Sequence, residues 1–358
     1  MKTRSWLAIT AALLLLTAAG LYGILRTSDG DAALRGDLLA AMPGDASSIV
    51  FVDLAELRKA PFFAQVLAWA PKPQADADYL QFVLETGFDY ERDLDRIALA
   101  VEQRDKESLL FGIADGKFDR KKIADYAAKK GLCFTYQQHE ICTVPEAGSD
   151  ARKIYFTFWT KQRMAITDDM RLVKLLAGAE KAMDAKEWQT LFNRLAGSPI
   201  FAVVRQNGTI GTALAAQAPG GLQSPQLSTL LDQLDWITVA AKPEGDALRV
   251  VVDGECPTDA SARQLADVLN GIVIIAQAGL NDSKARQQMA PTARAAYLEL
   301  LKSADISKID RGDTKSVRVV LDITQDLLNA ARIPAPAVPL AAPSAVKKPA
   351  PKQPAIKK

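Results

Sequence analysis

The chain contains little histidine and little cysteine, which restricts the chemistry that it can perform. Its 358 residues include one histidine, His139, and three cysteines. Histidine-rich metal sites and zinc-protease helices need more than one imidazole, so both are excluded. Cys133, His139 and Cys142 would supply three metal ligands, but at an unfamiliar spacing, and we expect His139 to lie in a surface turn instead.

Sequence motifs of the common enzyme classes are also absent. The chain has no Gly-x-Ser-x-Gly nucleophile elbow, no phosphate-binding glycine-rich loop and no dinucleotide fingerprint. Its Ser-x-x-Lys motif, Ser344 to Lys347, lies in a proline-rich segment that offers no rigid scaffold for a nucleophile. We therefore expect a protein that is not an enzyme, with no catalytic residues, no cofactor and no metal.

An uncharged apolar run opens the chain. Residues 6–25 form twenty positions without charge, which at about 1.5 Å per residue span a bilayer as a helix. Lys2 and Arg4 precede the run, and this predicts a single-pass anchor with its N-terminus in the cytoplasm and an extracytoplasmic body, periplasmic or at the cell surface. The alternative is a cleaved signal ending near Ala18-Ala19-Gly20, which would export the body equally.

Charge is distributed unevenly between the body and the two ends. Nine of the 44 basic residues lie outside residues 27–331, whereas all 42 acidic residues lie inside, so the body has a net charge of −7. A body of this charge is not expected to bind nucleic acid. Residues 332–358 hold seven prolines and five lysines and predict a disordered tail, either a spacer or a contact to an anionic envelope polymer or lipid headgroup.

The body repeats one order of elements. Leu94 to Ala100 and Leu234 to Ala240 share Leu, Asp, Ile and Ala at an offset of 140, and both are typical of strands. Each is followed by a second strand that ends in Asp-Gly, at Asp115-Gly116 and Asp253-Gly254. The opening and closing elements recur as well, and a join is expected near Gly197.

A helix follows each Asp-Gly pair, at about residues 119–130 and 258–278. Apolar residues at helical spacing predict that the second helix buries one stripe against a sheet; they are Leu265, Val268, Leu269, Ile272 and Ile275. Short turns between strands indicate antiparallel pairing.

We therefore expect an α+β fold of two similar modules, each a mainly antiparallel sheet with helices on one face, preceded by one transmembrane helix. The expected division is a signal anchor at 1–26, a linker at 27–42, a first module at 43–197, a second module at 198–331 and the tail at 332–358.

The opening of the body also carries a family resemblance. Met42-Pro43-Gly44-Asp45-Ala46, leading into Ile49 to Leu54, resembles the start of uncharacterised bacterial membrane-anchored extracytoplasmic proteins of unknown function. The resemblance covers roughly Pro43 to Ala330. It implies one N-terminal anchoring helix and brings no catalytic residues with it.

Three further motifs have local structural explanations. The acidic run Asp89 to Asp95 has interleaved arginines and is expected to lead into the following strand rather than to bind calcium. Asp168-Asp169 is a candidate helix cap, and Arg311-Gly312-Asp313 is expected to form a hairpin turn.

Aromatic residues are concentrated between residues 62 and 90. Such a set could line a pocket for an apolar ligand or pack a core beneath the first sheet. The candidate ligand-binding residues are Phe62, Phe63, Trp69, Tyr79, Phe82, Phe88 and Tyr90.

The predicted function is that of a non-catalytic, membrane-anchored envelope protein, whose body is an interaction or scaffold module. Its expected partner is the cytoplasmic membrane, through residues 6–25. The alternative is an extracytoplasmic carrier for a lipid or another apolar ligand, and the third candidate is an enzyme of an unrecognised class.

The cysteines suit a cross-strand disulfide. Leu132 to Tyr136 and Glu140 to Val144 are typical of two short strands, and a two-residue turn at Gln137-Gln138 places Cys133 opposite Cys142. A bond between them would leave Cys256 unpaired. A slip of one residue in the register would separate them as two free thiols.

Overall fold

A computed structural model describes residues 36–69, 77–104, 107–146, 149–176, 186–206 and 225–331. The predicted membrane-spanning run at residues 6–25 and the tail at 332–358 lie outside these ranges. Within them, no helix combines the length and the apolar character needed to cross a membrane.

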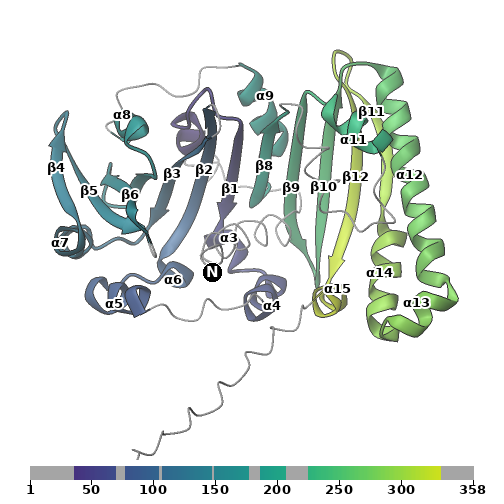
Figure 1. Cartoon of the computed structure of the whole chain (residues 1–358), viewed down its shortest axis with the longest axis horizontal. Coiled ribbons are helices and arrows are strands. Elements are labelled where there is room, and N and C mark those ends of the chain that lie inside the picture. The colour runs from purple at the N-terminus through teal and green to yellow at the C-terminus, as the bar shows by residue number, and fades with distance from the viewer. Residues whose placement is uncertain are drawn as a thin grey trace, which may run out of the picture.

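The described residues form one large antiparallel sheet with helices, which confirms the α+β class (Figure 1). Its strand order is β11-β12-β10-β9-β8-β1-β2-β3-β7-β6-β5-β4. The strands are β1 (Ser48–Asp53), β2 (Leu94–Arg104), β3 (Glu107–Gly116), β4 (Leu132–Tyr136), β5 (His139–Glu146), β6 (Ser149–Phe158), β7 (Arg163–Thr167), β8 (Ile200–Arg205), β9 (Trp236–Glu244), β10 (Ala247–Cys256), β11 (Asp305–Asp310) and β12 (Lys315–Thr324).

The helices lie between the strands in sequence. After a short helix over residues 36–40, they are α3 (Leu54–Leu57), α4 (Pro61–Trp69), α5 (Ala77–Thr86), α6 (Tyr90–Asp93), α7 (Arg120–Lys130), η1 (Met170–Leu172), α8 (Val173–Leu176), α9 (Lys186–Leu195), α11 (Pro225–Asp232), α12 (Asp259–Asn281), α13 (Ser283–Gln288), α14 (Pro291–Ser303) and α15 (Gln325–Ala330).

Strand order is the same in the two halves of the sheet. From the centre outward, one half runs β1-β2-β3-β7-β6 and the other runs β8-β9-β10-β12-β11; the first half then continues with β5 and β4. Ala98 pairs with Ile113 in the first half and Thr238 pairs with Asp253 in the second, so both strands of the hairpin correspond at an offset of 140. The two Asp-Gly pairs are 138 residues apart and are therefore two residues out of this register.

The two halves join edge to edge through β1 and β8, whereas the sequence predicted a separate sheet in each module. Phe51 lies opposite Phe201 in this antiparallel pair, and their rings stack with centroids 5.0 Å apart. Both strands are almost continuously apolar, as expected for strands that are covered on both faces.

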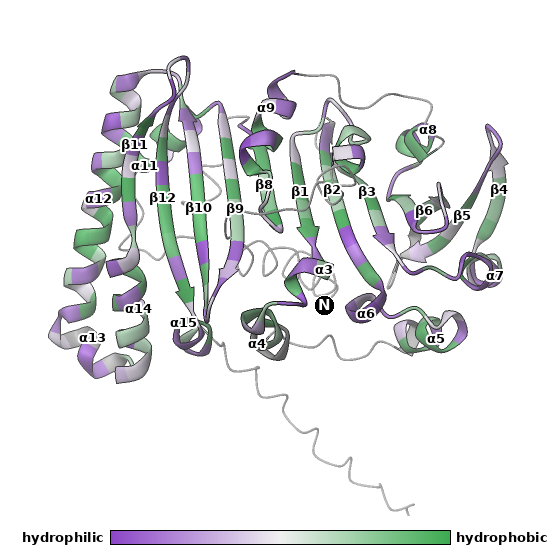
Figure 2. Ribbon diagram, turned by 180° about the vertical axis from the view of Figure 1, so that it is seen from behind, coloured by the Kyte–Doolittle hydropathy of each residue, from purple (hydrophilic) through white to green (hydrophobic). Residues whose placement is uncertain are grey.

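Helices pack on both faces of the sheet, contrary to the one-face arrangement predicted from the sequence. Phe51 points to one face and belongs to the core that includes Trp188 of α9. Its neighbour Val52 points to the other face, in the core that includes Phe62 of α4 and Leu328 of α15. The central strands are apolar over most of their length, as expected for strands that are covered by helices on both faces (Figure 2).

The long helix α12 departs from its predicted packing. Leu265 is buried as expected, but Ile275 is 63% exposed and Ile274 is 66% exposed. A helix of 23 residues is about 34 Å long, and only its first half packs over the sheet. Its far end lies against α14, where the Gln277 side chain donates a hydrogen bond to the Leu301 carbonyl at 2.9 Å.

Side-chain caps fix several helix starts. Asp119 accepts a hydrogen bond from the Lys122 amide at the start of α7, and Thr258 caps α12. Asp169 caps η1, and Asp89 caps α6, so the acidic run does lead into β2. Gly312 has a φ of +80° in the turn between β11 and β12.

Candidate functional site

The seven aromatic residues predicted as a ligand-binding set do not come together in one place. Phe62 and Phe63 are buried in the core beneath β1, β8 and β10. The side chain of Trp69 lies outside the described residues. The remaining four belong to α5 and the segment that follows it; they are Tyr79, Phe82, Phe88 and Tyr90.

Most of this second group packs between α5, α7 and the sheet. Phe82 contacts Tyr126 of α7 edge-on, with ring centroids 5.2 Å apart, and Phe88 stacks on Phe118 at 5.2 Å. Phe118 in turn lies 5.8 Å from Phe158 of β6. Tilted, offset and edge-on rings at these distances are the geometry of aromatic packing. The contacts therefore favour core packing for Phe82 and Phe88.

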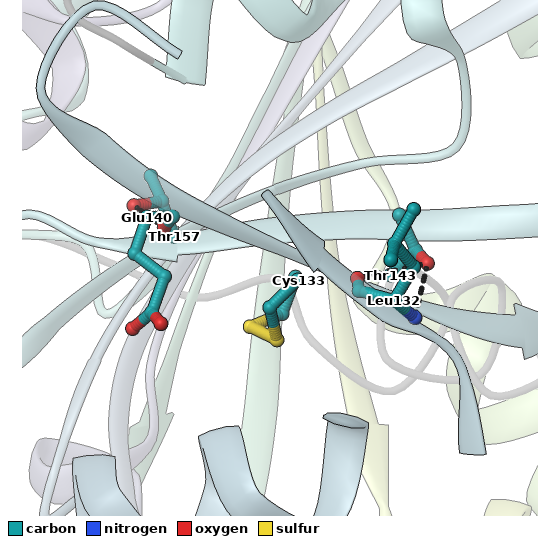
Figure 3. The surroundings of a disulfide bond; sticks show 6 residues. Leu132, Cys133, Glu140, Thr143 and Thr157 are labelled. Atoms are coloured by element: carbon teal, nitrogen blue, oxygen red, sulfur yellow. Dashed lines mark hydrogen bonds between the residues drawn. A yellow bond between two sulfur atoms is a disulfide. The ribbon is translucent and has the colours of Figure 1, made fainter. Parts of the chain in front are cut away.

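A disulfide joins β4 to β5 (Figure 3). Its two cysteines belong to the same core cluster as Phe82 and Phe88. Cys133 lies opposite Cys142 in the register expected from the sequence, and their Cα atoms are 4.0 Å apart. Gln137 and Gln138 have positive φ values of 47° and 70°, which is typical of a two-residue hairpin turn. Because the bond uses both thiols, neither serves the metal site considered above.

The end of α7 is fixed against this hairpin. Gly131 follows α7 directly, and a Cβ atom there would lie 2.0 Å from the carbonyl oxygen of Thr143, so only glycine fits. The Leu132 amide donates a hydrogen bond to the Thr143 hydroxyl at 3.1 Å (Figure 3). The remaining cysteine, Cys256, is buried and free, and burial raises the pKa of its thiol to about 11.

The outer side of α5 and α7 combines exposed leucines with lysines. Leu80 is 48% exposed and Leu84, one turn further along α5, is 84% exposed. Isolated exposed leucines are normal, but two at a spacing of four share one side of a helix. We call this surface the α5–α7 corner; it consists of Leu80 and Leu84 of α5 and of Lys129 and Lys130 of α7.

Ion pairs and hydrogen bonds hold the lysines of the corner to α5. Lys129 Nζ lies 2.7 Å from Glu85 Oε2, and Lys130 Nζ donates to Gln81 Oε1 at 3.1 Å. Lys121, near the start of α7, pairs with Asp125 of the same helix, and its side chain is 85% exposed. The helix α7 carries five basic residues and one acidic residue, and Glu85 of α5 and the cap Asp119 add negative charge beside them. The corner therefore combines exposed leucines with lysines that are partly neutralised by acidic neighbours.

Sequence inspection missed this corner, although a signal for it exists. In the helical repeat of α5, the side chains turned inward include Phe82, Val83 and Thr86, while Leu80 and Leu84 fall outside that stripe. A leucine outside the buried stripe of an amphipathic helix is the pattern that could have revealed it.

A second polar cluster lies on the sheet of the C-terminal half. Asp253 is buried and faces Arg318 across β10 and β12, and Arg318 donates to both of its carboxylate oxygens at 2.8 Å. Arg311 adds a third bond at 2.7 Å. In the first half, Arg163 makes the same bidentate contact with Asp115 across β3 and β7. Both halves therefore contain a bidentate Asp–Arg pair between neighbouring strands.

The electrostatic balance at Asp253 favours its charged form. Burial alone would raise the pKa of its carboxyl group, but Arg318 and Arg311 outweigh that effect and lower the pKa below its ordinary value of 3.8. The arginines satisfy the carboxylate, so the cluster has the character of a structural ion network.

An open depression of about 570 Å³ lies between α11 and α12. Its lining mixes apolar surface with the polar side chains of residues such as Gln226, Asp259 and Arg263. Arg263 pairs with Asp259 at 2.8 Å, and Lys308 also bonds Asp259. None of the seven aromatic candidates lines it.

Comparison with known proteins yields a distant structural similarity. No protein-family model matches the chain, and no curated protein matches it. Solved structures of TP0453, in crystal forms III, I and IV, resemble it with TM-scores of 0.47, 0.45 and 0.43 and sequence identities of 10%, 8% and 10%. They cover 83%, 82% and 83% of this chain and 97%, 96% and 97% of their own. The family resemblance inferred from residues 42–54 therefore remains a prediction.

The ion network predicts a specific pH dependence. A carboxylate with a lowered folded-state pKa stabilises the fold above its ordinary pKa, and this contribution is lost as the pH falls through the lower value. The substitution Asp253→Asn should lower the free energy of unfolding by about 3 kcal/mol at neutral pH. The difference from the unchanged protein should shrink below about pH 4. Urea unfolding at several pH values measures this; Asp125→Asn, on exposed α7, is the control, and a difference independent of pH would contradict it.

The disulfide predicts a labelling pattern in protein isolated from cells. Alkylation after denaturation without reduction should label Cys256 alone, because Cys133 and Cys142 are bonded. Peptide mapping by mass spectrometry reads this out. Replacing both bonded cysteines by serine should lower the free energy of unfolding by only about 2–3 kcal/mol, because the chain segment that the disulfide closes is short. Label on Cys133 and Cys142 in the native protein would argue against the bond and against an oxidising compartment.

Proposed function

We propose that the chain is a membrane-anchored extracytoplasmic protein without catalytic activity, whose body docks on the anionic surface of its own membrane through the α5–α7 corner. The observation that carries this proposal is the pair of exposed leucines, Leu80 and Leu84, beside Lys129 and Lys130 of α7. Apolar side chains that enter the headgroup region, flanked by lysines that contact anionic lipids, are typical of surfaces that lie on a membrane.

Chain connectivity favours the membrane over other anionic partners. If residues 6–25 span the bilayer, the ten residues from Arg26 to Arg35 reach at most about 36 Å before the body begins. The tether therefore holds the corner at a high effective concentration near lipid headgroups. A surface with low intrinsic affinity for lipid is then enough to keep the body docked, although the body as a whole is negatively charged.

We also propose that the two halves of the body arose by duplication. Their common strand order and the hairpin register at an offset of 140 support it.

The carrier alternative calls for an enclosed apolar cavity, whereas the depression between α11 and α12 is open and contains an ion pair. The interaction module is therefore the function we favour.

The full chain reconstituted in lipid nanodiscs tests the docking surface. Amide hydrogen exchange in α5 should slow in nanodiscs that contain anionic lipid, relative to nanodiscs of neutral lipid only, because insertion of Leu84 shields the helix. Leu80→Ser combined with Leu84→Ser should abolish this protection.

The matched control removes two other exposed apolar side chains, at the other end of the molecule. Ile274→Ser combined with Ile275→Ser, on α12, should keep the protection of α5. Identical exchange of α5 in anionic and neutral nanodiscs would overturn the proposed docking.

A further inference from the structure

The sheet ends in two edge strands that differ in how they are protected. At one end, β11 carries charges along its length, its Ile306 packs into the core with α12, and its Lys308 bonds Asp259 of that helix. At the other end, β4 has the sequence Leu-Cys-Phe-Thr-Tyr, without a charge, a proline or a bulge against β5. Natural edge strands are normally blocked by such features.

No described helix lies beyond β4, which forms the outermost strand at its end of the sheet (Figure 1). Its first residue, Leu132, is 61% exposed. An uncharged edge strand that begins with an exposed leucine is a template for pairing with another strand.

The register of the hairpin shows which backbone groups are free. The Cα separation of 4.0 Å at Cys133 and Cys142 is that of the close pair in an antiparallel ladder, which exchanges no hydrogen bonds. The neighbouring positions Leu132, Phe134 and Tyr136 therefore bond to β5. The amide and carbonyl groups of Cys133 and Thr135 consequently point away from β5, along the open edge.

We propose that β4 pairs antiparallel with β4 of a second copy of this chain about a two-fold axis at Phe134. This register places Cys133 of one copy opposite Thr135 of the other. Because these two residues carry the outward groups, each such pair exchanges two backbone hydrogen bonds, and the symmetry repeats the pair.

The side chains fit this symmetric register. Alternation along β4 places Leu132, Phe134 and Tyr136 on the face opposite the disulfide. Leu132 then meets Tyr136 of the second copy, which covers its exposed surface, and the two Phe134 rings meet at the axis. Because β4 carries no charge, its pairing with β4 of a second copy brings no like charges together.

The same type of junction already exists inside the molecule. The pairing of β1 with β8 is antiparallel, and Phe51 faces Phe201 within it. The proposed dimer would extend the sheet across a second phenylalanine pair. It goes beyond the proposed docking function and does not depend on it.

Photo-cross-linking of the detergent-solubilised full chain tests the register. Phe134→p-benzoylphenylalanine keeps an aromatic side chain at the axis. Irradiation should give a covalent dimer whose cross-link, mapped by mass spectrometry, joins residue 134 to β4 of the second copy. A cross-linked dimer attached outside β4, or no dimer at any concentration, would overturn the proposal, as would capture of a different protein instead.

A backbone variant separates edge pairing from folding. Thr135→Pro removes an amide that points to the open edge, so the bonds to β5 and the disulfide should remain. The dissociation constant of the dimer, measured by sedimentation, should rise at least about tenfold, because each copy loses one intermolecular bond. Thr135→Val is the control and should dimerise unchanged. If both variants dimerise equally while the disulfide is intact, the two copies do not pair through the open edge of β4.

Discussion

The pairing of β1 with β8 is the interaction on which the rest of the structure depends. Each strand closes its own half of the sheet, and together they remove two edges that would otherwise be open and apolar. Phe51 and Phe201 stack across the junction, so buried apolar side chains and the backbone hydrogen bonds between β1 and β8 both stabilise it. The helices on both faces pack against strands whose position this junction fixes.

Local features of the fold were accessible from the sequence, and long-range ones were not. Caps such as Asp119 and Thr258 act within one helical turn, and the register of Cys133 with Cys142 follows from a two-residue turn. The union of the two halves depends on strands about 150 residues apart, which no local pattern encodes. The exposure of Ile275 depends on where the sheet ends beneath α12, a tertiary property that helical periodicity does not contain.

The candidate surface was hidden from sequence reasoning for a related reason. Aromatic residues attracted attention because they bury large areas, but the ring contacts of Phe82 and Phe88 place them in the packing beneath α5. The leucines that face outward look like ordinary core residues until the orientation of the helix is known. The buried charge of Asp253 also depends on tertiary partners: Arg318 lies on the neighbouring strand β12, and Arg311 lies in the turn before it.

Native-state hydrogen exchange of β1 and β8 tests the central claim most directly, because their amides report whether the halves separate. If the junction holds the fold together, the amides of both strands should be among the slowest to exchange, with an opening free energy equal to that of global unfolding. Faster exchange of β1 and β8 together, while β3 and β10 remain protected, would show that two halves stay folded apart, and would contradict the account.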